Sequence, residues 1–483
     1  MSRALDGGIK IFMPNETKKP VKQEEFERLF YPKTVAIIGA SNSPLKLGYG
    51  FMEGLVEGGF AGEIYPVNPK LSEILGLKVY PSLSTIPISI DMAIVTVPGH
   101  LVPSVLRECA QRGVKGVILL AGGFKELNTE SGIKLQEEIV TIANRAGIKI
   151  IGPNTLGLVS PYANLNASFV PTFKDVKKGN IAVICQSGGV CSFLVHSMIN
   201  KKLGVSLAMS LGNRGNVEFA DLVEYLAEHS QTRVIALYIE GVDDPLRLIQ
   251  VAKRVVNKKP IVAYKVGGEV LSRATLSHTG SLAGKYEVYS AAFSQAGIIP
   301  ANDCEELIDV AKALSLQPPS RGNRVAVLSP QAGPGIIAAY ACQSCGLTLA
   351  GFSPQARKRL KKLVGPMFFC DNPVDITMVG FEPQKTQDIL DVVWNEGCVD
   401  VILISCCYSQ THSVPIIEMV LKFFKDRGNK GATKPVVICH ESPNGAADRE
   451  IARLEENSIP VYPLPERAAR AAAGLVKYGS VVR

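Results

Sequence analysis

One pattern occurs three times along this chain and limits the folds that it can adopt. A short apolar run is followed by a turn of small residues and then by a helical stretch, and the apolar runs are TVAII at 34–38, NIAVIC at 180–185 and RVAVL at 324–328. Runs of this length, rich in valine and isoleucine, are typical of buried strands. Strand, turn and helix repeated with short connections predict parallel, doubly wound α/β sheets.

The length of 483 residues predicts about three domains. An apolar fraction of 46%, a charged fraction of 20% and 44 glycines are typical of globular α/β proteins. Polar stretches at 160–179 and 315–323 are predicted linkers. We therefore expect an N-terminal tail and three domains, at residues 1–24, 25–160, 178–315 and 322–483.

Several classes of protein are disfavoured by composition. No run of about 18 uncharged apolar residues is present, and the first 22 residues lack the features of a secretory signal, so we expect a cytoplasmic protein without a membrane partner. The 11 cysteines are an odd number and no CxxC pairs with another, which indicates reduced thiols and no metal site. A net charge of +8 suits a small anionic ligand, and we predict no nucleic-acid partner.

In the first section, small and basic residues follow the predicted strands. Gly39, Ala40 and Ser41 come after the first strand, and Lys46 follows within the same loop. Small residues allow backbone amides to approach a phosphate, and a lysine neutralises its charge. Because ligands bind at the carboxyl ends of the strands in such sheets, we expect a phosphate-bearing ligand here.

The end of the second strand separates two kinds of nucleotide ligand. A dinucleotide site requires the pattern GxGxxG and an acidic residue at this position, but the chain has Gly-Ala-Ser and then Asn68 and Lys70. A cation there suits a ligand with an additional phosphate near its ribose, as coenzyme A has. A nicotinamide-dependent dehydrogenase remains a less favoured alternative.

Two further turns resemble each other in design. Ser187, Gly188 and Gly189 lie between a predicted strand and a helix, and a second turn with Ala332, Gly333 and Gly335 precedes a helix predicted at 336–344. The first turn of a helix leaves backbone amides available, and its dipole favours negative charge. Two such sites in adjacent flavodoxin-like domains suggest that one anionic group is held between two helix ends.

His278 lies in a loop of small and polar residues at 267–284. A predicted strand at 260–266 precedes this loop and a helical run at 285–296 follows it. Connections between strand and helix carry chemistry in α/β proteins, which makes His278 a candidate catalytic residue.

The order of these motifs resembles a known family. The chain contains in succession GASNSPLKLG, YPVNPK, VTVPGH, AGGFKE, GPNTLG, CQSGG, IEGV, SHTGSLAG, QAGPG, NPVDIT and IPVYPLPERA. Over residues 25–480 it is similar to the α subunits of the acyl-CoA synthetases that form a nucleoside diphosphate, which include ADP-forming acetyl-CoA synthetases and relatives of succinyl-CoA synthetase. So many ordered motifs are far more specific than a single glycine loop.

The resemblance implies a fold and a set of site residues. The first section would be a Rossmann-like CoA-binding domain, and the other two would be flavodoxin-like CoA-ligase domains. His278 would be phosphorylated, Glu240 would hold its imidazole, and the turns at 187–189 and 332–335 would hold the phosphate. The candidate CoA-binding residues are Gly39, Ala40, Ser41, Lys46, Asn68, Lys70, Val97, Pro98, Gly123, Glu126 and Asn154.

The resemblance also implies a reaction and a partner. Acyl-CoA and phosphate would give an acyl phosphate and free CoA, and a neutral imidazole would then take the phosphoryl group and pass it to ADP. In the family the nucleotide, ADP or ATP with Mg²⁺, is bound by an ATP-grasp domain, and no section of this chain matches one. We therefore expect a separate ATP-grasp β subunit in an α₂β₂ assembly.

Three departures from the family pattern concern the site. Thr155 replaces a frequent cysteine, SPQAGPG at 329–335 has one glycine fewer than usual, and Cys406, Cys407 and Tyr408 replace a threonine-proline segment. These changes bear on acyl specificity and on the second turn. A CoA-binding regulatory module without catalysis is the alternative function, and the presence of His278 disfavours it.

Overall fold

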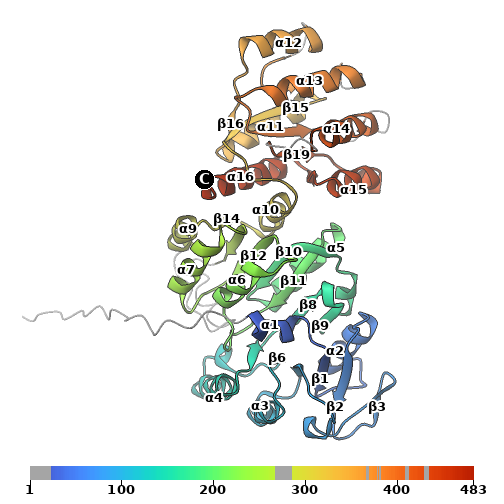
Figure 1. The fold of residues 1–483 in the computed structure, drawn as a ribbon, viewed down its shortest axis with the longest axis vertical. Coiled ribbons are helices and arrows are strands. Elements are labelled where there is room, and N and C mark those ends of the chain that lie inside the picture. The colour runs from blue at the N-terminus through green and yellow to red at the C-terminus, as the bar shows by residue number, and fades with distance from the viewer. Residues whose placement is uncertain are drawn as a thin grey trace, which may run out of the picture.

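The computed structural model describes residues 23–266, 286–365, 369–377, 379, 382–407, 413–428 and 434–483. Within these residues the chain forms three α/β units that are stacked along the longest axis of the molecule (Figure 1). None of the helices in the described part of the chain has the length and the hydropathy of a transmembrane span. The predicted fold class, a CoA-binding-type sheet followed by two flavodoxin-like units, is confirmed by three separate sheets whose main strands run parallel.

The first sheet is parallel throughout the described chain and has the order β2-β1-β5-β6-β7. Its strands are β1 (Thr34–Ile38), β2 (Glu63–Val67), β5 (Met92–Val95), β6 (Gly116–Leu119) and β7 (Lys149–Ile151), and a small hairpin is formed by β3 (Glu73–Ile74) and β4 (Leu77–Lys78). The helices of this unit are α2 (Leu47–Glu57), α3 (Val102–Gln111) and α4 (Glu130–Ala146). β1 pairs with both β2 and β5, so the order of the strands reverses beside β1 and opens a crevice at their carboxyl ends.

The second sheet has the order β14-β13-β12-β10-β11-β8-β9 within the described residues. Its strands are β8 (Gly157–Ser160), β9 (Leu165–Ser168), β10 (Lys178–Cys185), β11 (Val205–Ser210), β12 (Val234–Ile239), β13 (Ile261–Lys265) and β14 (Ile299–Ala301). The helices are α5 (Gly188–Asn200), α6 (Phe219–Glu228), α7 (Pro245–Val255), α9 (Tyr286–Gln295) and α10 (Cys304–Leu316). β10 pairs with β11 on one side and β12 on the other, so a second crevice opens beside the end of β10.

The prediction of a linker at 160–179 is wrong. β8 and β9 form an antiparallel hairpin that extends the second sheet, and all four residues of β9 are buried. The polar residues that indicated a linker bond to one another: the Ser168 hydroxyl donates to Asn166 Oδ1 at 2.7 Å, and Asn166 Nδ2 donates to the Val170 carbonyl at 3.0 Å. Burial of polar side chains is tolerated here because each of these groups has a partner.

The third sheet follows the order β16-β15-β18-β19-β20, with β17 also paired to β15, over the described residues. Its strands are β15 (Arg324–Ser329), β16 (Thr348–Leu349), β17 (Val374–Asp375), β18 (Val401–Ser405), β19 (Val436–Cys439) and β20 (Val461–Tyr462). Its helices are α11 (Ala332–Ser344), α12 (Pro354–Val364), α13 (Pro383–Asn395), α14 (Ser413–Gly428), α15 (Asp448–Glu456) and α16 (Pro465–Val481).

Helix α11 begins four residues before the predicted start at residue 336. Pro334 is its third residue, a position where the backbone N–H has no partner within the helix and proline is therefore tolerated. Ala332 and Gly333 thus belong to the first turn of the helix and not to the loop that precedes it.

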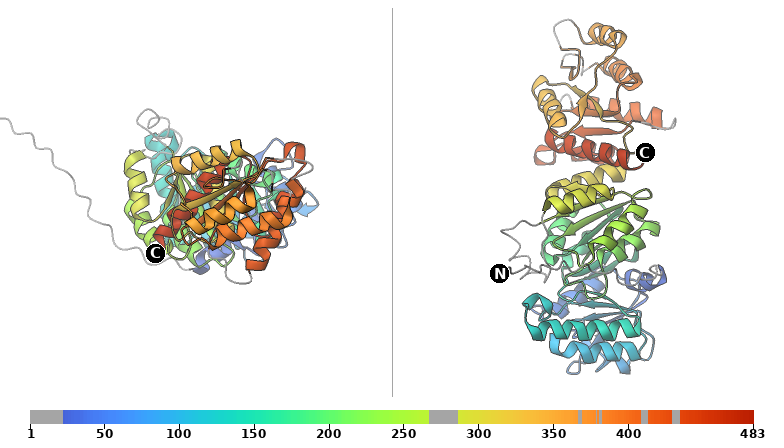
Figure 2. Two further views of the ribbon diagram at one scale, coloured as in Figure 1. Left: turned by 90° about the horizontal axis from the view of Figure 1, so that it is seen from above. Right: turned by 90° about the vertical axis from the view of Figure 1, so that its left-hand side faces the viewer.

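Aromatic residues of the first helix attach the N-terminal part of the chain to the second unit. Phe26 and Phe30 of α1 (Gln23–Phe30) pack on Tyr225 of α6 with ring centroids 5.3 and 5.1 Å apart. At the other junction, α16 of the third unit lies beside α10 of the second. The three units therefore form a linear stack, which the right-hand view in Figure 2 also shows.

Candidate functional site

A cavity of about 810 Å³ lies where the strand ends of the first unit face the start of α5 in the second. The first unit contributes loops that follow β5, β6 and β7, and the second contributes the loops after β9, β10 and β11. The lining residues are Leu47, Thr96, Val97, Pro98, Gly99, Leu120, Ala121, Gly122, Asn154, Thr155, Leu156, Phe169, Val170, Gln186, Ser187, Gly188, Gly189, Ser192 and Gly212.

Six of the residues predicted from sequence line this one cavity. Val97, Pro98 and Asn154 come from the predicted CoA-binding set. The whole turn at 187–189, predicted to bind phosphate, lies across from them. The structure therefore places candidate CoA-binding residues and candidate phosphate-binding residues on the walls of the same cavity.

The other residues of the predicted CoA set lie around the crevice of the first sheet. Gly39 has a φ of 95° and lies so close to Thr96 and Val97 that a β-carbon would approach Thr96 Oγ1 to 2.6 Å. Asn68 Nδ2 donates to the Ala40 carbonyl at 2.8 Å, which joins the ends of β1 and β2. Ser41 is buried, whereas Lys46 and Lys70 are exposed. Both lysines are therefore accessible to a ligand that lies over these strand ends.

Glu126 has a structural role in the loop after β6. Its Oε1 accepts from the backbone N–H of Gly123 at 2.6 Å, and its Oε2 accepts from Asn213 Nδ2 of the second unit. The predicted pair Gly123 and Glu126 thus lies at the junction of the two units, next to the cavity-lining Gly122. These contacts fix the loop that faces the cavity.

The first turn of α5 is built to leave backbone amides open to the cavity. Ser187 is the N-cap, and its hydroxyl accepts from the Val190 backbone N–H. Gly188 packs so closely on Leu156 that a β-carbon would lie 3.2 Å from Leu156 Cβ, whereas Gly189 is exposed. The helix dipole adds partial positive charge here, so this wall of the cavity favours an anion.

Gln186 is a site residue that the sequence analysis did not identify. Its side chain is fully buried, and its Oε1 accepts from the backbone N–H groups of Glu240 and Gly241, both at 2.9 Å. These residues follow β12, the neighbour of β10 at the crevice. The glutamine in the motif CQSGG was the available signal, because a polar residue between a buried strand and a glycine turn requires a partner.

Glu240, the predicted partner of the histidine, is buried directly behind this turn. Tyr238 donates from its hydroxyl to Glu240 Oε1 at 3.3 Å. On the adjacent strand, Lys265 pairs with Ile239 and is also buried, and burial lowers the pKa of the Lys265 ammonium group despite the nearby Glu240 charge.

His278 lies outside the described residues, which stop at 266 and resume at 286. The chain enters that segment next to Glu240, because the Val266 N–H donates to the Ile239 carbonyl at 3.0 Å. The role of His278 stays a prediction, and the position of Glu240 at the base of this segment is consistent with it.

A network of charges holds the loop after Glu240. Arg214 is buried with a φ of 56°, and it donates to the Gly241 carbonyl and to the carboxylates of Asp243 and Glu218. Lys125 of the first unit reaches the same Asp243 at 3.3 Å. Burial raises the pKa of Glu218 to about 7 even though Arg214 opposes the shift. These contacts join the first two units beside the candidate site.

Thr155, one of the departures from the family pattern, is buried on the cavity wall. Its hydroxyl lies 2.5 Å from the Ser210 carbonyl and 2.8 Å from the Ser210 hydroxyl, and it accepts from the Gly157 N–H. The threonine therefore ties the loop after β7 to the end of β11.

The second turn that was predicted to bind an anion, at 332–335, does not line the cavity at 187–189. Ala332 and Gly335 line a separate cavity of about 280 Å³ together with Phe369, Pro373 and Asp375 of the third unit. Cys407 donates its backbone N–H to Gln331 Oε1 at 3.2 Å in this turn, and Cys406 is buried. Within the described chain, the cavity at 187–189 and the cavity at 332–335 share no lining residue.

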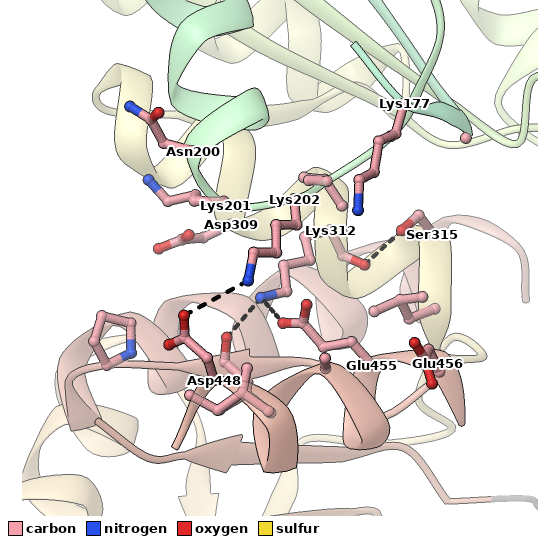
Figure 3. A pocket seen from close by; sticks show the side chains of 18 of the residues that line it. Lys177, Asn200, Lys201, Lys202, Asp309, Lys312, Ser315, Asp448, Glu455 and Glu456 are labelled. Atoms are coloured by element: carbon pink, nitrogen blue, oxygen red, sulfur yellow. Dashed lines mark hydrogen bonds and ion pairs between the residues drawn. The ribbon is translucent and has the colours of Figure 1, made fainter. Parts of the chain in front are cut away.

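A third cavity, of about 710 Å³, separates the second and third units and is lined by many charged residues (Figure 3). Lys312 forms an ion pair with Glu455 and donates to the Val461 carbonyl at 2.7 Å, and Lys202 lies 3.6 Å from Asp448. Arg467 binds both carboxylate oxygens of Asp309 at 2.7 Å. Because most of these charges are paired across the junction, we interpret this space as a structural contact between domains.

Three family models match the chain in succession. A CoA binding domain matches residues 33–161, a succinyl-CoA ligase like flavodoxin domain matches 178–314, and a ligase-CoA domain matches 325–478.

Curated relatives and solved structures agree with these models. The α subunit of acetate–CoA ligase (ADP-forming) II from Pyrococcus furiosus is 39% identical over 93% of this chain and 96% of its own. Acetate–CoA ligase (ADP-forming) I from Archaeoglobus fulgidus is 38% identical over 94% of this chain, which spans 64% of that longer protein. A structure of acetyl-coenzyme A synthetase 1 from Candidatus Korarchaeum cryptofilum, in complex with phosphate and ADP, has a TM-score of 0.85 at 34% identity and covers 95% of this chain and 98% of its own.

Both the identity and the coverage extend over nearly the whole chain, and the matched domains occur in the order that the sequence motifs predicted. The chain belongs to the family of the α subunits of ADP-forming acetate–CoA ligases.

Proposed function

We propose that this chain carries the acyl-transfer half of an ADP-forming acyl-CoA synthetase, with acetate as the acid. The overall reaction converts acyl-CoA, ADP and phosphate into the free acid, CoA and ATP. The observation that carries this proposal is the cavity in which Val97, Pro98 and Asn154 of the CoA-binding unit face the start of α5. A thioester bound by the first unit would lie next to a phosphate held by the second.

Each wall of the cavity would contribute to the first step. The strand ends of the first unit would hold CoA, with Lys46 and Lys70 beside its phosphates, as their exposure allows. Phosphate at the amides of Gly188 and Gly189 would attack the thioester carbonyl, and the carbon–sulfur bond would break to release CoA. Helix amides that point at the developing negative charge stabilise it without a change of protonation.

The second step would transfer the phosphoryl group to His278. The imidazole attacks phosphorus, the bond to the acyl oxygen breaks, and the carboxylic acid leaves. Glu240, buried next to the segment that carries His278, would accept a hydrogen bond from the other ring nitrogen and stabilise the cationic ring. ADP would then take the phosphoryl group from the histidine.

The nucleotide step is assigned to a partner. Relatives named as α subunits imply a β subunit, and the chain spans only 64% of a longer relative whose name gives no subunit. We propose that the partner is an ATP-grasp subunit that binds ADP or ATP with Mg²⁺, in an α₂β₂ assembly. The catalytic function is favoured over a regulatory CoA-binding module because relatives that match nearly the whole chain are named ligases.

Labelling from radioactive phosphate tests the proposal directly. Acetyl-CoA and phosphate should label the chain with an acid-labile, alkali-stable phosphoryl group, and His278→Ala should abolish it. Glu240→Gln should slow labelling about 100-fold, as expected for a group that orients an imidazole. His196→Ala is the matched control, because His196 bonds only to Thr172 and Ser192 in the described chain and should leave labelling intact. Labelling that persists in His278→Ala would refute the proposed intermediate.

A further inference from the structure

The side chain of Gln186 carries a hydrogen-bond donor, and no described residue accepts a hydrogen bond from it. Gln186 follows β10 and directly precedes Ser187, the N-cap of α5. It lines the same cavity as Pro98 and Gly189, and its side chain is fully buried. Its Nε2 has no hydrogen-bond partner in the described part of the chain. A buried donor without a partner destabilises the folded chain, so its presence requires an explanation.

The orientation of this amide is fixed by its neighbours. Two backbone N–H groups, those of Glu240 and Gly241, point at one end of the carboxamide at 2.9 Å. Only the oxygen accepts hydrogen bonds, so the NH₂ group must occupy the other end. The backbone of Gln186 is held as well, by hydrogen bonds with the Tyr238 carbonyl and the Gly212 N–H, both at 3.0 Å. The donor is therefore held in one position before any ligand binds.

Its surroundings indicate what it binds. The amides of Gly188 and Gly189 begin the helix immediately after it, and this end of α5 carries partial positive charge. A further N–H donor at this position adds to the same preference for an anion. We propose that Gln186 is a catalytic residue whose Nε2 donates a hydrogen bond to an oxygen of the phosphate held at the start of α5. Through its Oε1, the same side chain also fixes the backbone at Glu240.

This inference rests on the proposed function, because it takes the anion at α5 to be phosphate. Its test is Gln186→Glu, which keeps an oxygen for the two backbone N–H groups and replaces the donor with a charged acceptor. The KM for phosphate in the exchange of phosphate with acetyl-CoA should rise at least 10-fold. The kcat of this exchange should fall about 100-fold, in the range for loss of one oxyanion donor. The Kd for CoA should change less than twofold, because CoA binds to the first unit. A variant that merely disrupted the structure of the cavity would weaken CoA binding as well.

Gln317→Glu is the matched control. Gln317 is also a buried glutamine, but its Oε1 accepts from Val436 N–H at 2.7 Å and its Nε2 donates to the Ser458 carbonyl. This variant should lose stability and keep the wild-type KM for phosphate. If Gln186→Glu also keeps that KM and the wild-type kcat, the inference is overturned.

A crystal of the wild-type protein soaked in inorganic phosphate tests the contact between Gln186 and phosphate even if the variant does not fold. We expect a phosphate oxygen within about 2.7–3.2 Å of Gln186 Nε2. An ordered phosphate at Gly188 and Gly189 without this contact overturns the inference and leaves the proposed function intact. Failure of the wild type both to bind phosphate and to catalyse the exchange overturns the proposed function and this inference together.

Discussion

At the scale of single residues, Gly188 is a position where the site tolerates little change. A β-carbon there would lie 3.2 Å from Leu156 Cβ, and the same backbone supplies an amide to the cavity. We expect Gly188→Ala to shift the turn, because added volume at a packed contact costs about 1–3 kcal/mol. Calorimetry should show phosphate affinity reduced about 10-fold or more. Gly351→Ala, which places a β-carbon in open space outside the residues that line this cavity, is the control, with affinity close to wild type.

His229 gives the stability of the chain a defined dependence on pH. Its Nε2 lies 2.6 Å from the Tyr31 hydroxyl and its Nδ1 lies 2.7 Å from Thr232 Oγ1. Burial, followed by the nearby Lys259 charge, lowers the pKa of His229 from 6.5 to about 4. The unfolded chain therefore binds a proton more readily than the folded chain between these values, so the contribution of neutral His229 is lost as pH falls from 6.5 to 4.

Thermal melting from pH 4 to 7.5 measures this effect. The Tm of the wild type should decline below pH 6.5 more steeply than that of His229→Gln, a variant that has no titrating ring. At pH 7.5 the variant should be less stable by about 1–3 kcal/mol, since it loses well-placed buried hydrogen bonds. Parallel pH profiles for the two proteins would contradict this assignment.

Some residues of the site could be predicted from the sequence, and others could not. Glycines in sharp turns and the Ser-Gly-Gly motif could be predicted because few other residues permit that backbone, and Gly39 indeed has a positive φ. Gln186 was missed because its role depends on Glu240, which is 54 positions away in the sequence. The presence of one polar residue in a turn does not show which strand ends beside it in the folded chain.

At the scale of secondary-structure elements, the contact between α2 and β9 joins the first two units. A β-carbon at Gly54 would lie 2.9 Å from the Asn166 carbonyl and 3.0 Å from the Ser168 carbonyl. We expect Gly54→Val to force these elements apart and to destabilise the chain by about 1–3 kcal/mol, because backbone atoms cannot move aside easily. Urea unfolding measures the loss. Gly59→Ala, which places a β-carbon in open space but at a positive φ, should cost less.

The strands of the parallel sheets were predictable as elements, whereas the hairpin of β8 and β9 was not. Repeated apolar runs identified β1, β10 and β15 with their correct starts or nearly so. The segment LNAS of β9 has only two apolar residues, and its burial depends on α2 packing across it. Long-range packing of this kind leaves little periodicity in the sequence.

The second and third units repeat one arrangement at their crevices. In each, a glutamine oxygen in the turn before the helix accepts a backbone N–H from the end of an adjacent strand: Gln186 from Glu240, and Gln331 from Cys407. The repetition of strand, turn and helix was predictable from the sequence. The separation of the two turns into different cavities was not, because it depends on how α16 and α10 orient the units.

At the scale of the whole molecule, the matched domains support the proposed division of the reaction between subunits. The cavity at α5 lies between the first two units, and three family models account for residues 33–161, 178–314 and 325–478 without a nucleotide-binding domain among them. We therefore propose acyl transfer for this chain and ATP formation for its complex with a β subunit.

Synthesis of ATP from acetyl-CoA, ADP and phosphate tests whether the isolated chain lacks the nucleotide step. The purified chain should release CoA in a phosphate-dependent reaction and become phosphorylated, but it should form no ATP by itself. Addition of the β subunit should restore ATP formation, and His278→Ala should abolish it in the same complex. Robust ATP synthesis by the isolated chain would contradict the proposed division between subunits, and synthesis by the complex that contains His278→Ala would contradict the phosphohistidine intermediate.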